Sequence, residues 1–179
     1  MSEKLKPAPV LRVCSCLTGL PELLPEVEAE LVRAFGEVAL KSVPFAFDTS
    51  EYYRPEMGEG LQRTWYGFRD LCPAERLVEA RLKTGEIEDR FAVEGRRRVN
   101  LDPGYLDLGK LVLASLKEAP DKIHMGDGVW AHVCLQFRDG KFTAPDHSFP
   151  DFKDGRFDEL MLEARELYKS LLSYNAPNG

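Results

Sequence analysis

The 179-residue chain is 44% hydrophobic, 30% charged and 10% aromatic, which is typical of a globular protein and excludes a disordered or fibrous one. Its 24 basic and 30 acidic residues give a net charge of −6, and this acidity argues against a general nucleic-acid-binding protein. The length fits one domain. We expect that domain to cover residues 1–179, with loose ends at 1–8 and 175–179.

The chain begins without the apolar segment of a secretory signal, and no apolar run approaches the ~20 residues of a membrane helix. Its four cysteines, at positions 14, 16, 72 and 134, have no C-x-x-C spacing. Cys14 and Cys16 share one face of a predicted strand with Cα atoms about 6.6 Å apart, near the upper limit for a disulfide. We therefore expect free thiols, no membrane and a cytoplasmic location.

Hydrophobic periodicity predicts the elements of the first half of the chain. It predicts strands at 10–17, 38–47 and 61–71, and helices from 21 or 25 to 35 and from 73 to 84. Gly36 is placed to end the first helix, and Pro44 indicates an edge or a bend in the second strand. Thr84-Gly85 is predicted to end the second helix, ahead of a shorter helical piece at 87–92.

The second half of the chain is predicted to be mostly strand. Strands are expected at 96–101, 110–116 and 128–137, with a short one near Phe142 and a final helix at 157–174. Asp102-Pro103-Gly104 is predicted as a turn that ends the first of these strands. Asp139-Gly140 is a dipeptide typical of tight hairpins and joins the last two strands.

The first six elements run strand, helix, strand, strand, helix, strand, which is the order of the ferredoxin-like βαββαβ unit. The chain is therefore predicted to be an α+β single domain with an antiparallel or mixed sheet. Both early helices should cover one face of that sheet, and C-terminal hairpins and a final helix should extend it. A mixed sheet of another topology is the main alternative.

Residues two apart in a strand share a face, and three predicted strands carry hydrogen-bonding groups on one face. The polar sets are Arg63, Trp65 and Arg69; Arg96, Arg98, Asn100 and Asp102; and Trp130, His132, Cys134 and Gln136. The last set lies opposite apolar residues at 129, 131, 133, 135 and 137. We expect the polar faces to converge into a ligand-binding surface, and the alternative is a face that only contacts water.

The connection at 51–58 carries two tyrosines, two carboxylates and an arginine. Loops held on a rigid sheet are where binding groups concentrate, although a purely structural loop explains the same composition. His132 and Cys134 could supply half of a zinc site, but neither His124 nor His147 completes it. Phosphate-binding and dinucleotide motifs are absent from the sequence, so we predict neither a metal nor a cofactor.

Several short motifs together resemble the bacterial family known as domain of unknown function 4416. The matching segments are Phe47-Asp48-Thr49, Tyr52-Tyr53, Glu56-Met57-Gly58, Lys83-Thr84, Ile87-Glu88, Val99 to Leu106, Lys110 to Ser115, Gly128 to Ala131 and Phe149 to Phe152. His132 stands where this family usually has a glutamate, and His147-Ser148 stands where it has Trp-Thr. The resemblance implies no activity, but it marks ten polar positions as shared: Asp48, Tyr53, Glu56, Arg63, Glu88, Asn100, Asp102, Tyr105, Lys110 and Lys117.

Two functions of different classes fit these residues. The first is binding or turnover of a small anionic molecule, phosphorylated ones included, by cationic side chains beside carboxylates that move protons. Glu56 and Asp102 are its candidate catalytic groups, and its candidate ligand-binding residues are Tyr53, Arg63, Arg98, Asn100, Tyr105, Lys110 and Lys117. The second is a non-enzymatic module that binds protein or RNA through exposed aromatic residues such as Trp65 and Trp130.

The predicted strand order gives the distance between the third strand, which carries Arg63, and the fourth strand, which carries Asn100. Arg63 and Asn100 would lie two strands apart, about 9–10 Å, with Glu56 and Asp102 nearby. An arginine at this place is expected to be exposed and to contribute little to the fold. Arg63→Ala is therefore expected to weaken ligand binding much more than stability.

Overall fold

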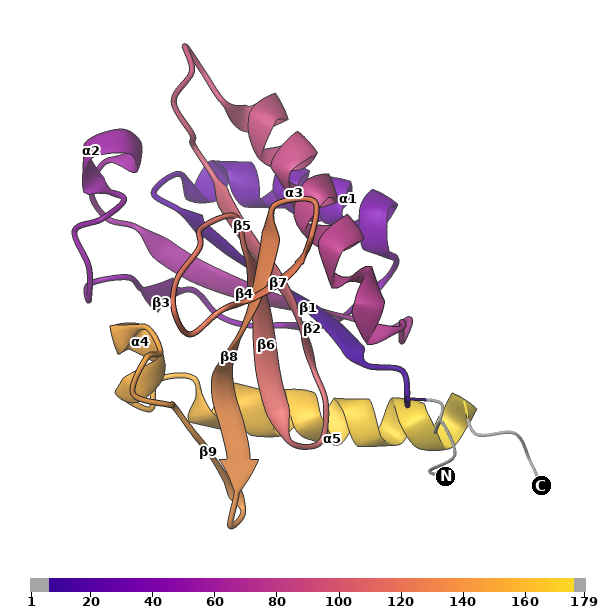
Figure 1. Cartoon of the computed structure of the whole chain (residues 1–179). Coiled ribbons are helices and arrows are strands. Elements are labelled where there is room, and N and C mark those ends of the chain that lie inside the picture. Colours follow the sequence, from indigo (N-terminus) through magenta and orange to yellow (C-terminus); the bar gives the residue numbers. More distant parts are fainter. Residues whose placement is uncertain (1–6, 176–179) are drawn as a thin grey trace.

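β1 (Leu11–Thr18) is an internal strand of the sheet, because β4 (Gln62–Phe68) and β5 (Asn100–Leu106) pair with its two edges (Figure 1). The computed structural model describes residues 7–175, so the loose ends expected at 1–8 and 175–179 lie almost wholly outside it. The described residues form one α+β domain with a nine-stranded sheet whose pairings are all antiparallel.

The strands follow the order β2-β4-β1-β5-β6-β8-β7, with β3 on β4 and β9 on β8. The remaining strands are β2 (Val38–Lys41), β3 (Phe45–Ala46), β6 (Lys110–Ser115), β7 (Ile123–Gly126), β8 (Val129–Arg138) and β9 (Lys141–Thr143). The helices are α1 (Leu24–Phe35), α2 (Arg54–Met57), α3 (Leu77–Phe91), α4 (Pro150–Lys153) and α5 (Asp158–Asn175). No helix among residues 7–175 combines the length and the apolar character needed to cross a bilayer.

Hydrophobic residues pack on both faces of the sheet, and α1 and α3 lie on one side of it with α5 on the other (Figure 1). On one face α1 and α3 pack together over Cys14, Cys16 and Tyr66, as expected for the two early helices. On the other face α5 packs over a core that includes Leu11 and Trp65. This second face is polar at its far end, where α5 does not cover it, and there the pocket forms.

The second predicted helix ends later than expected. α3 runs through Thr84 and Gly85 to Phe91 as one helix, so the predicted stop and the separate piece at 87–92 were wrong. Glycine inside a helix costs about 1 kcal/mol, but Thr84 is buried with its hydroxyl bonded to the Arg81 carbonyl, and Ile87 is 1% exposed. Burial beyond Gly85 offsets the cost of continuing the helix.

The predicted turn at 102–104 is instead part of β5, which begins at Asn100 and not at Arg96. Leu101 directs its N–H and carbonyl away from β1, toward side chains of α3. The backbone nitrogen of Pro103, two residues later, points to the same side as that of Leu101. Pairing with β6 begins only at Gly104. Because no strand of the described residues lies opposite Pro103 on that side, the hydrogen that proline lacks costs the sheet no hydrogen bond. Gly104 permits the close approach, because a Cβ there would lie 2.2 Å from the Val112 carbonyl oxygen.

β8 does not keep the single apolar face that its alternation predicted. Its register with β6 shifts between the pairs Val112–Val133 and Leu111–Leu135. Such a bulge inserts one residue and changes the faces of those that follow. Val129, Ala131 and Val133 pack toward α3, whereas Leu135 joins Cys134 in the core under α5.

Candidate functional site

The pocket forms where β5 and β6 diverge. The two strands pair only from Gly104 to Leu106, so residues 100–103 of β5 have no neighbouring strand on that side. Two side chains of α3 bond this open edge: the Leu101 N–H donates to Glu88 Oε1 at 2.6 Å, and the Leu101 carbonyl accepts from Arg81 at 3.0 Å. A cavity of about 530 Å³ opens beside it.

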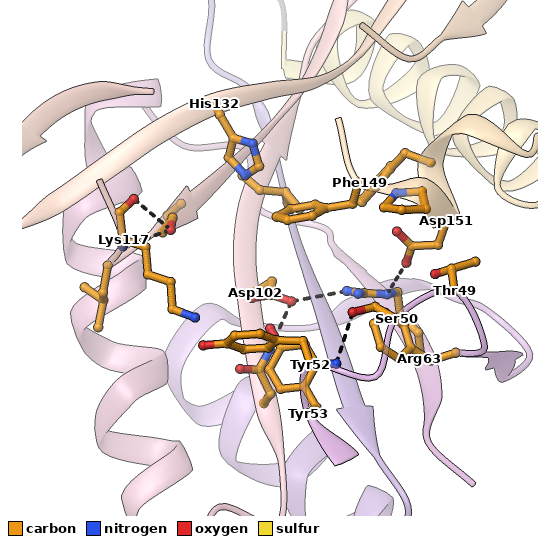
Figure 2. A pocket seen from close by; sticks show the side chains of 18 of the residues that line it. Thr49, Ser50, Tyr52, Tyr53, Arg63, Asp102, Lys117, His132, Phe149 and Asp151 are labelled. Atoms are coloured by element: carbon orange, nitrogen blue, oxygen red, sulfur yellow. Dashed lines mark hydrogen bonds and ion pairs between the residues drawn. The ribbon is translucent and has the colours of Figure 1, made fainter. Parts of the chain in front are cut away.

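Segments distant in sequence build the walls of this cavity (Figure 2). They are the loop from Phe47 to Tyr53, the strands β4, β5, β6 and β8, α3, the segments before β5 and after β6, and α4 with the residue before it. Aromatic rings stand on two sides, with Tyr52 from the first loop and Phe149 from the α4 segment. Both residues are exposed, at 58% and 47%.

Arg63 lies at the centre of the polar end of the pocket. Its Nη1 donates to Ser15 Oγ at 2.7 Å and to Asp102 Oδ2 at 3.2 Å, and its Nε lies 3.1 Å from Asp151 Oδ2. The strand register brings Arg63 close to the start of β5, because Arg63 and Asn100 both pair with Leu17 of β1, one on each edge. Arg63 is only 5% exposed, so the expectation that it is an exposed side chain of little structural weight was wrong.

Asp151 is the least satisfied charged group of the described residues. It is 1% exposed, and neither carboxylate oxygen accepts a hydrogen bond from residues 7–175. The contact with Arg63 Nε is an ion pair without hydrogen-bond geometry. Burial raises the pKa of Asp151, and the positive charge of Arg63 opposes that rise.

Two lysines lie at another side of the cavity, on the segment after β6. Lys117 and Lys122 form no ion pair with a carboxylate among residues 7–175. Partial burial, followed by the neighbouring charge of Lys122, lowers the pKa of Lys117. Lys122 Nζ donates to Ser115 Oγ at 2.9 Å and to the Lys117 carbonyl at 3.2 Å, which leaves one of its three N–H donors free.

His132 of β8 is a buried member of the pocket wall. Its ring packs edge-on against Phe149 at a centroid distance of 5.3 Å, and burial lowers its pKa to about 4. Its ring nitrogens lie 3.6 and 3.7 Å from the Cys134 sulfur. No cluster of three or more metal-ligating side chains occurs among the described residues. All four cysteines are buried free thiols, as expected.

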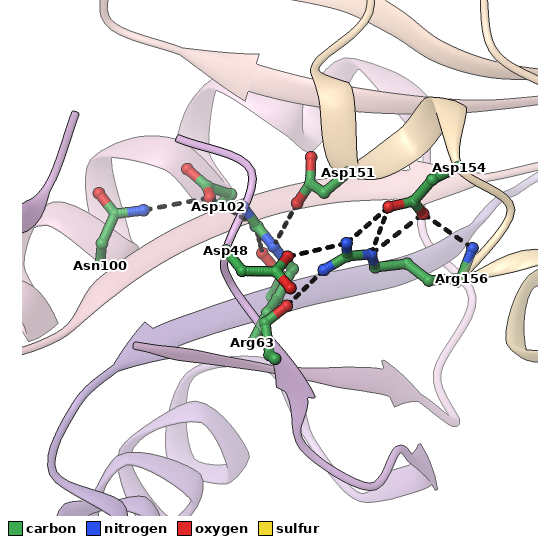
Figure 3. A network of polar contacts seen from close by, with 9 residues as sticks. Asp48, Arg63, Asn100, Asp102, Asp151, Asp154 and Arg156 are labelled. Carbon is green, nitrogen blue, oxygen red and sulfur yellow. Dashed lines mark hydrogen bonds and ion pairs between the residues drawn. The ribbon is translucent and has the colours of Figure 1, made fainter. Parts of the chain in front are cut away.

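The two loops over the pocket are tied together by Arg156 (Figure 3). Its guanidinium donates to Asp48 Oδ1 at 2.9 Å and to the carbonyl of Ala46, and it also pairs with Asp154. These bonds connect Ala46 and the start of the first loop to the segment after α4. They hold Asp151 of α4 over Arg63.

Five of the nine site residues predicted from the sequence line the cavity. They are Tyr53, Arg63, Asn100, Asp102 and Lys117. Asn100 Nδ2 donates to Asp102 Oδ2 at 3.1 Å. Burial raises the pKa of Tyr53 to about 12, which keeps its hydroxyl protonated.

The other four predicted residues do not line the cavity. Glu56 binds the Arg97 side chain through both carboxylate oxygens, at 2.9 and 2.6 Å, and this pairing lowers its pKa. Arg98 precedes β5, and its carbonyl accepts from Thr18 Oγ1. Tyr105 packs toward α3 on the opposite face of the sheet, and Lys110 pairs with Asp107.

Lys122, Asp151 and Phe149 are among the residues that line the cavity and were not predicted as site residues from the sequence. Asp151 and Phe149 belong to the Phe-Pro-Asp-Phe segment that resembles the family, and this was the only sequence signal for them. Lys122 lies in a turn-rich stretch ahead of β7, a strand that the periodicity did not predict. The short helices α2 and α4 were also missed, because four residues are too few for a helical pattern.

Comparison with known proteins gives one family and one partial relative. A family model described as a domain of unknown function (DUF4416) matches residues 8–168. One subunit of the aspartyl/glutamyl-tRNA(Asn/Gln) amidotransferase of Treponema denticola is 33% identical over 107 residues, which are 57% of this chain and 21% of that protein. The chain thus spans about a fifth of that relative's length. No solved structure matches the chain significantly.

Proposed function

The chain belongs to the DUF4416 family of domains of unknown function, and from its pocket we propose that it binds a small anionic molecule, phosphorylated ones included. The observation that carries the proposal is the pair Lys117 and Lys122, two cations that line a 530 Å³ cavity without a carboxylate partner among the described residues. A cavity of this size suits a small organic ligand.

The lowered pKa of Lys117 supports an anion at this place. Its causes are partial burial and the positive charge of Lys122, so no carboxylate of the described residues compensates the charged form. An anion between the two ammonium groups would supply that partner and would raise the pKa again. Ligand affinity should therefore fall as the pH rises through the pKa of Lys117, below the usual lysine range.

The aromatic walls support an apolar or planar body on the ligand. Tyr52 and Phe149 expose large ring surfaces beside the cavity, and Lys117 Nζ lies 3.7 Å from the centre of the Tyr52 ring. A planar group between the rings would bury apolar area that is otherwise exposed to water. An aromatic anion such as phenyl phosphate combines both features.

Calorimetric titration with phenyl phosphate tests the proposal. Binding is expected for the wild type, and Lys117→Ala or Lys122→Ala should weaken it by about 10-fold or more, because hydrogen bonds to charged groups contribute about 1.5–3 kcal/mol. Lys110→Ala is the matched control, since Lys110 pairs with Asp107 outside the cavity. Equal affinity for the wild type and both pocket variants would contradict the proposal.

A second function, binding of RNA, is favoured by the partial match to a protein whose name includes an aspartyl/glutamyl-tRNA amidotransferase. Its structural support is weaker than expected from the sequence, because Trp65 is buried against Phe157 and cannot stack on a base. Titration with tRNA at several salt concentrations separates the two functions. Tight, Lys117-dependent tRNA binding without phenyl phosphate binding would favour RNA.

We also propose a ferredoxin-like unit as the scaffold of the site. The support is the order β2-β4-β1-β5 with antiparallel pairings and with α1 and α3 on one face. The four free, buried cysteines support a cytoplasmic location. Alkylation and mass spectrometry of the unreduced protein test the thiol state, and a mass loss of two protons at Cys14 and Cys16 would contradict it.

A further inference from the structure

The charges that line the pocket are divided between two ends. Lys117 and Lys122 give one end two positive charges without a carboxylate partner among the described residues. At the other end Arg63 is shared by Asp102 and Asp151, so two carboxylates face one cation. Arg81 and Arg97 also line the cavity, but each pairs with a glutamate and adds no net charge. Figure 2 shows Lys117 and Asp151 on opposite sides of the pocket.

The carboxylate end has hydrogen-bonding capacity that the described residues do not use. Both hydrogen bonds that Asp102 accepts end on Oδ2, so Oδ1 accepts none from residues 7–175, and its side chain is 27% exposed. Asp151 contacts Arg63 from α4 and is 1% exposed, and neither of its carboxylate oxygens accepts a hydrogen bond from the same residues. A carboxylate buried without donors is costly, so such a group points to a donor from outside the described residues.

Only a donor, and best a cation, can complete this end. With both carboxylates ionised, one arginine between them leaves a net charge of −1 in a partly buried pocket, where charges interact more strongly than in bulk solvent. An ammonium group placed against Asp102 Oδ1 would bring the cluster of Arg63, Asp102 and Asp151 to neutrality. A second anion at this end would add to the surplus negative charge instead.

We propose that the ligand is an amino-bearing anion, whose ammonium group lies against Asp102 and whose anionic group lies between Lys117 and Lys122. This inference rests on the proposed function and adds the opposite end of the ligand. Aminated aryl or alkyl phosphates and carboxylates belong to the class, with an apolar body that separates the two charges and lies between Tyr52 and Phe149. Simple phosphates without an amine do not belong to it.

A matched series of probes tests the amine separately from the anion. The probes are phenyl phosphate, 4-(hydroxymethyl)phenyl phosphate, 4-(aminomethyl)phenyl phosphate and 4-(2-aminoethyl)phenyl phosphate, titrated calorimetrically into the wild type. At least one amine should bind about 10- to 100-fold more tightly than the hydroxymethyl probe, which matches the aminomethyl probe in size but lacks the charge.

The variant Asp102→Asn should remove this preference, because it lacks the negative charge that the ammonium group would contact. Asp107→Asn, which changes an ion pair outside the cavity, is the control and should keep the preference for the amine probes. If Asp102→Asn does not fold, the wild-type comparison of amine and hydroxymethyl probes still decides.

The outcomes separate the two proposals. Equal affinity for amine and hydroxymethyl probes, with phenyl phosphate binding that depends on Lys117, would overturn the amino-bearing ligand and leave anion binding intact. Phenyl phosphate binding that does not depend on Lys117 would overturn the proposed function. Binding of no probe at all would overturn both.

Discussion

Two buried arginine–carboxylate groups contact β5, one at its open edge from α3 and one on its pocket face, and they differ in how completely their hydrogen bonds are made. At the open edge, Arg81 donates to Thr84, to the Leu101 carbonyl and to Glu88, and Glu88 accepts from the Leu101 N–H. On the pocket face, Asp151 accepts no hydrogen bond from the described residues and Arg63 Nε donates none to them.

The difference separates a structural group from a binding group. The Arg81–Glu88 pair replaces the strand bonds that β5 lacks where β6 diverges, so it maintains the opening beside which the cavity forms. The Arg63 cluster lines the cavity and has donors and acceptors left over. Burial raises the pKa of both Glu88 and Asp151. The two carboxylates therefore differ in their hydrogen-bond partners and not in the direction of their pKa shifts.

Glu88→Ala should give the largest loss of stability. The change leaves the Leu101 N–H and the buried Arg81 guanidinium without their acceptor, and removal of one partner of a buried pair costs about 3–5 kcal/mol. Urea denaturation of the wild type and the variant measures the difference. A loss below about 1 kcal/mol would show that this pair does not hold β5, and Glu86→Ala, on the exposed side of α3, is the matched control.

His132 should make the pocket face sensitive to acid. Its pKa is lowered to about 4 by burial, against about 6.5 in the unfolded chain, so the unfolded state binds the proton more tightly. Stability should fall as the pH decreases from about 6.5 to 4, by up to about 3 kcal/mol. The measurement is the difference in the free energy of unfolding between the wild type and His132→Phe across this pH window. Taking the difference removes the contribution of carboxylates that titrate in the same window, because both proteins contain them.

A constant difference between the wild type and His132→Phe from pH 7 to pH 4 would mean that His132 titrates normally in the folded protein. The ring would then have to be open to water. That result would contradict its place in the buried wall of the pocket.

Asp151→Ala should change stability least of the three. Asp151 satisfies no donor of the described residues by a hydrogen bond, and Arg63 keeps its contacts with Ser15 and Asp102. The expected loss is about 1 kcal/mol or less, measured by the same denaturation experiment. A loss as large as that of Glu88→Ala would remove the distinction between the two groups and make Asp151 a structural residue.

Sequence patterns predicted the elements that depend on local signals. Gly36 ends α1 in a positive-φ conformation, and Asp139-Gly140 forms the β8–β9 turn with positive φ at both residues, as expected. The patterns failed where tertiary contacts override local preference. Gly85 stays helical because the following turns are buried, and Pro103 stays in a strand because β6 has not yet begun to pair there.

The site was predictable mainly where its residues lie on strands with a local sequence pattern. Arg63, Asn100 and Asp102 follow from strand faces and from the pairing order, and these depend on a period of two. Asp151 and Lys122 come from loops and a four-residue helix whose positions are set by contacts distant in sequence, such as Arg156 with Asp48. The burial of Arg63 depends on α4 above it, which no strand pattern indicates.

A crystal structure of the protein with 4-(aminomethyl)phenyl phosphate would show which end of the pocket takes which charge. We expect the phosphate within hydrogen-bond distance of Lys117 Nζ and Lys122 Nζ, the ring between Tyr52 and Phe149, and the ammonium against Asp102. A phosphate bound to Arg63 in place of Asp102 or Asp151, or a probe found only outside the cavity, would contradict the division of the pocket into a cationic end and a carboxylate end.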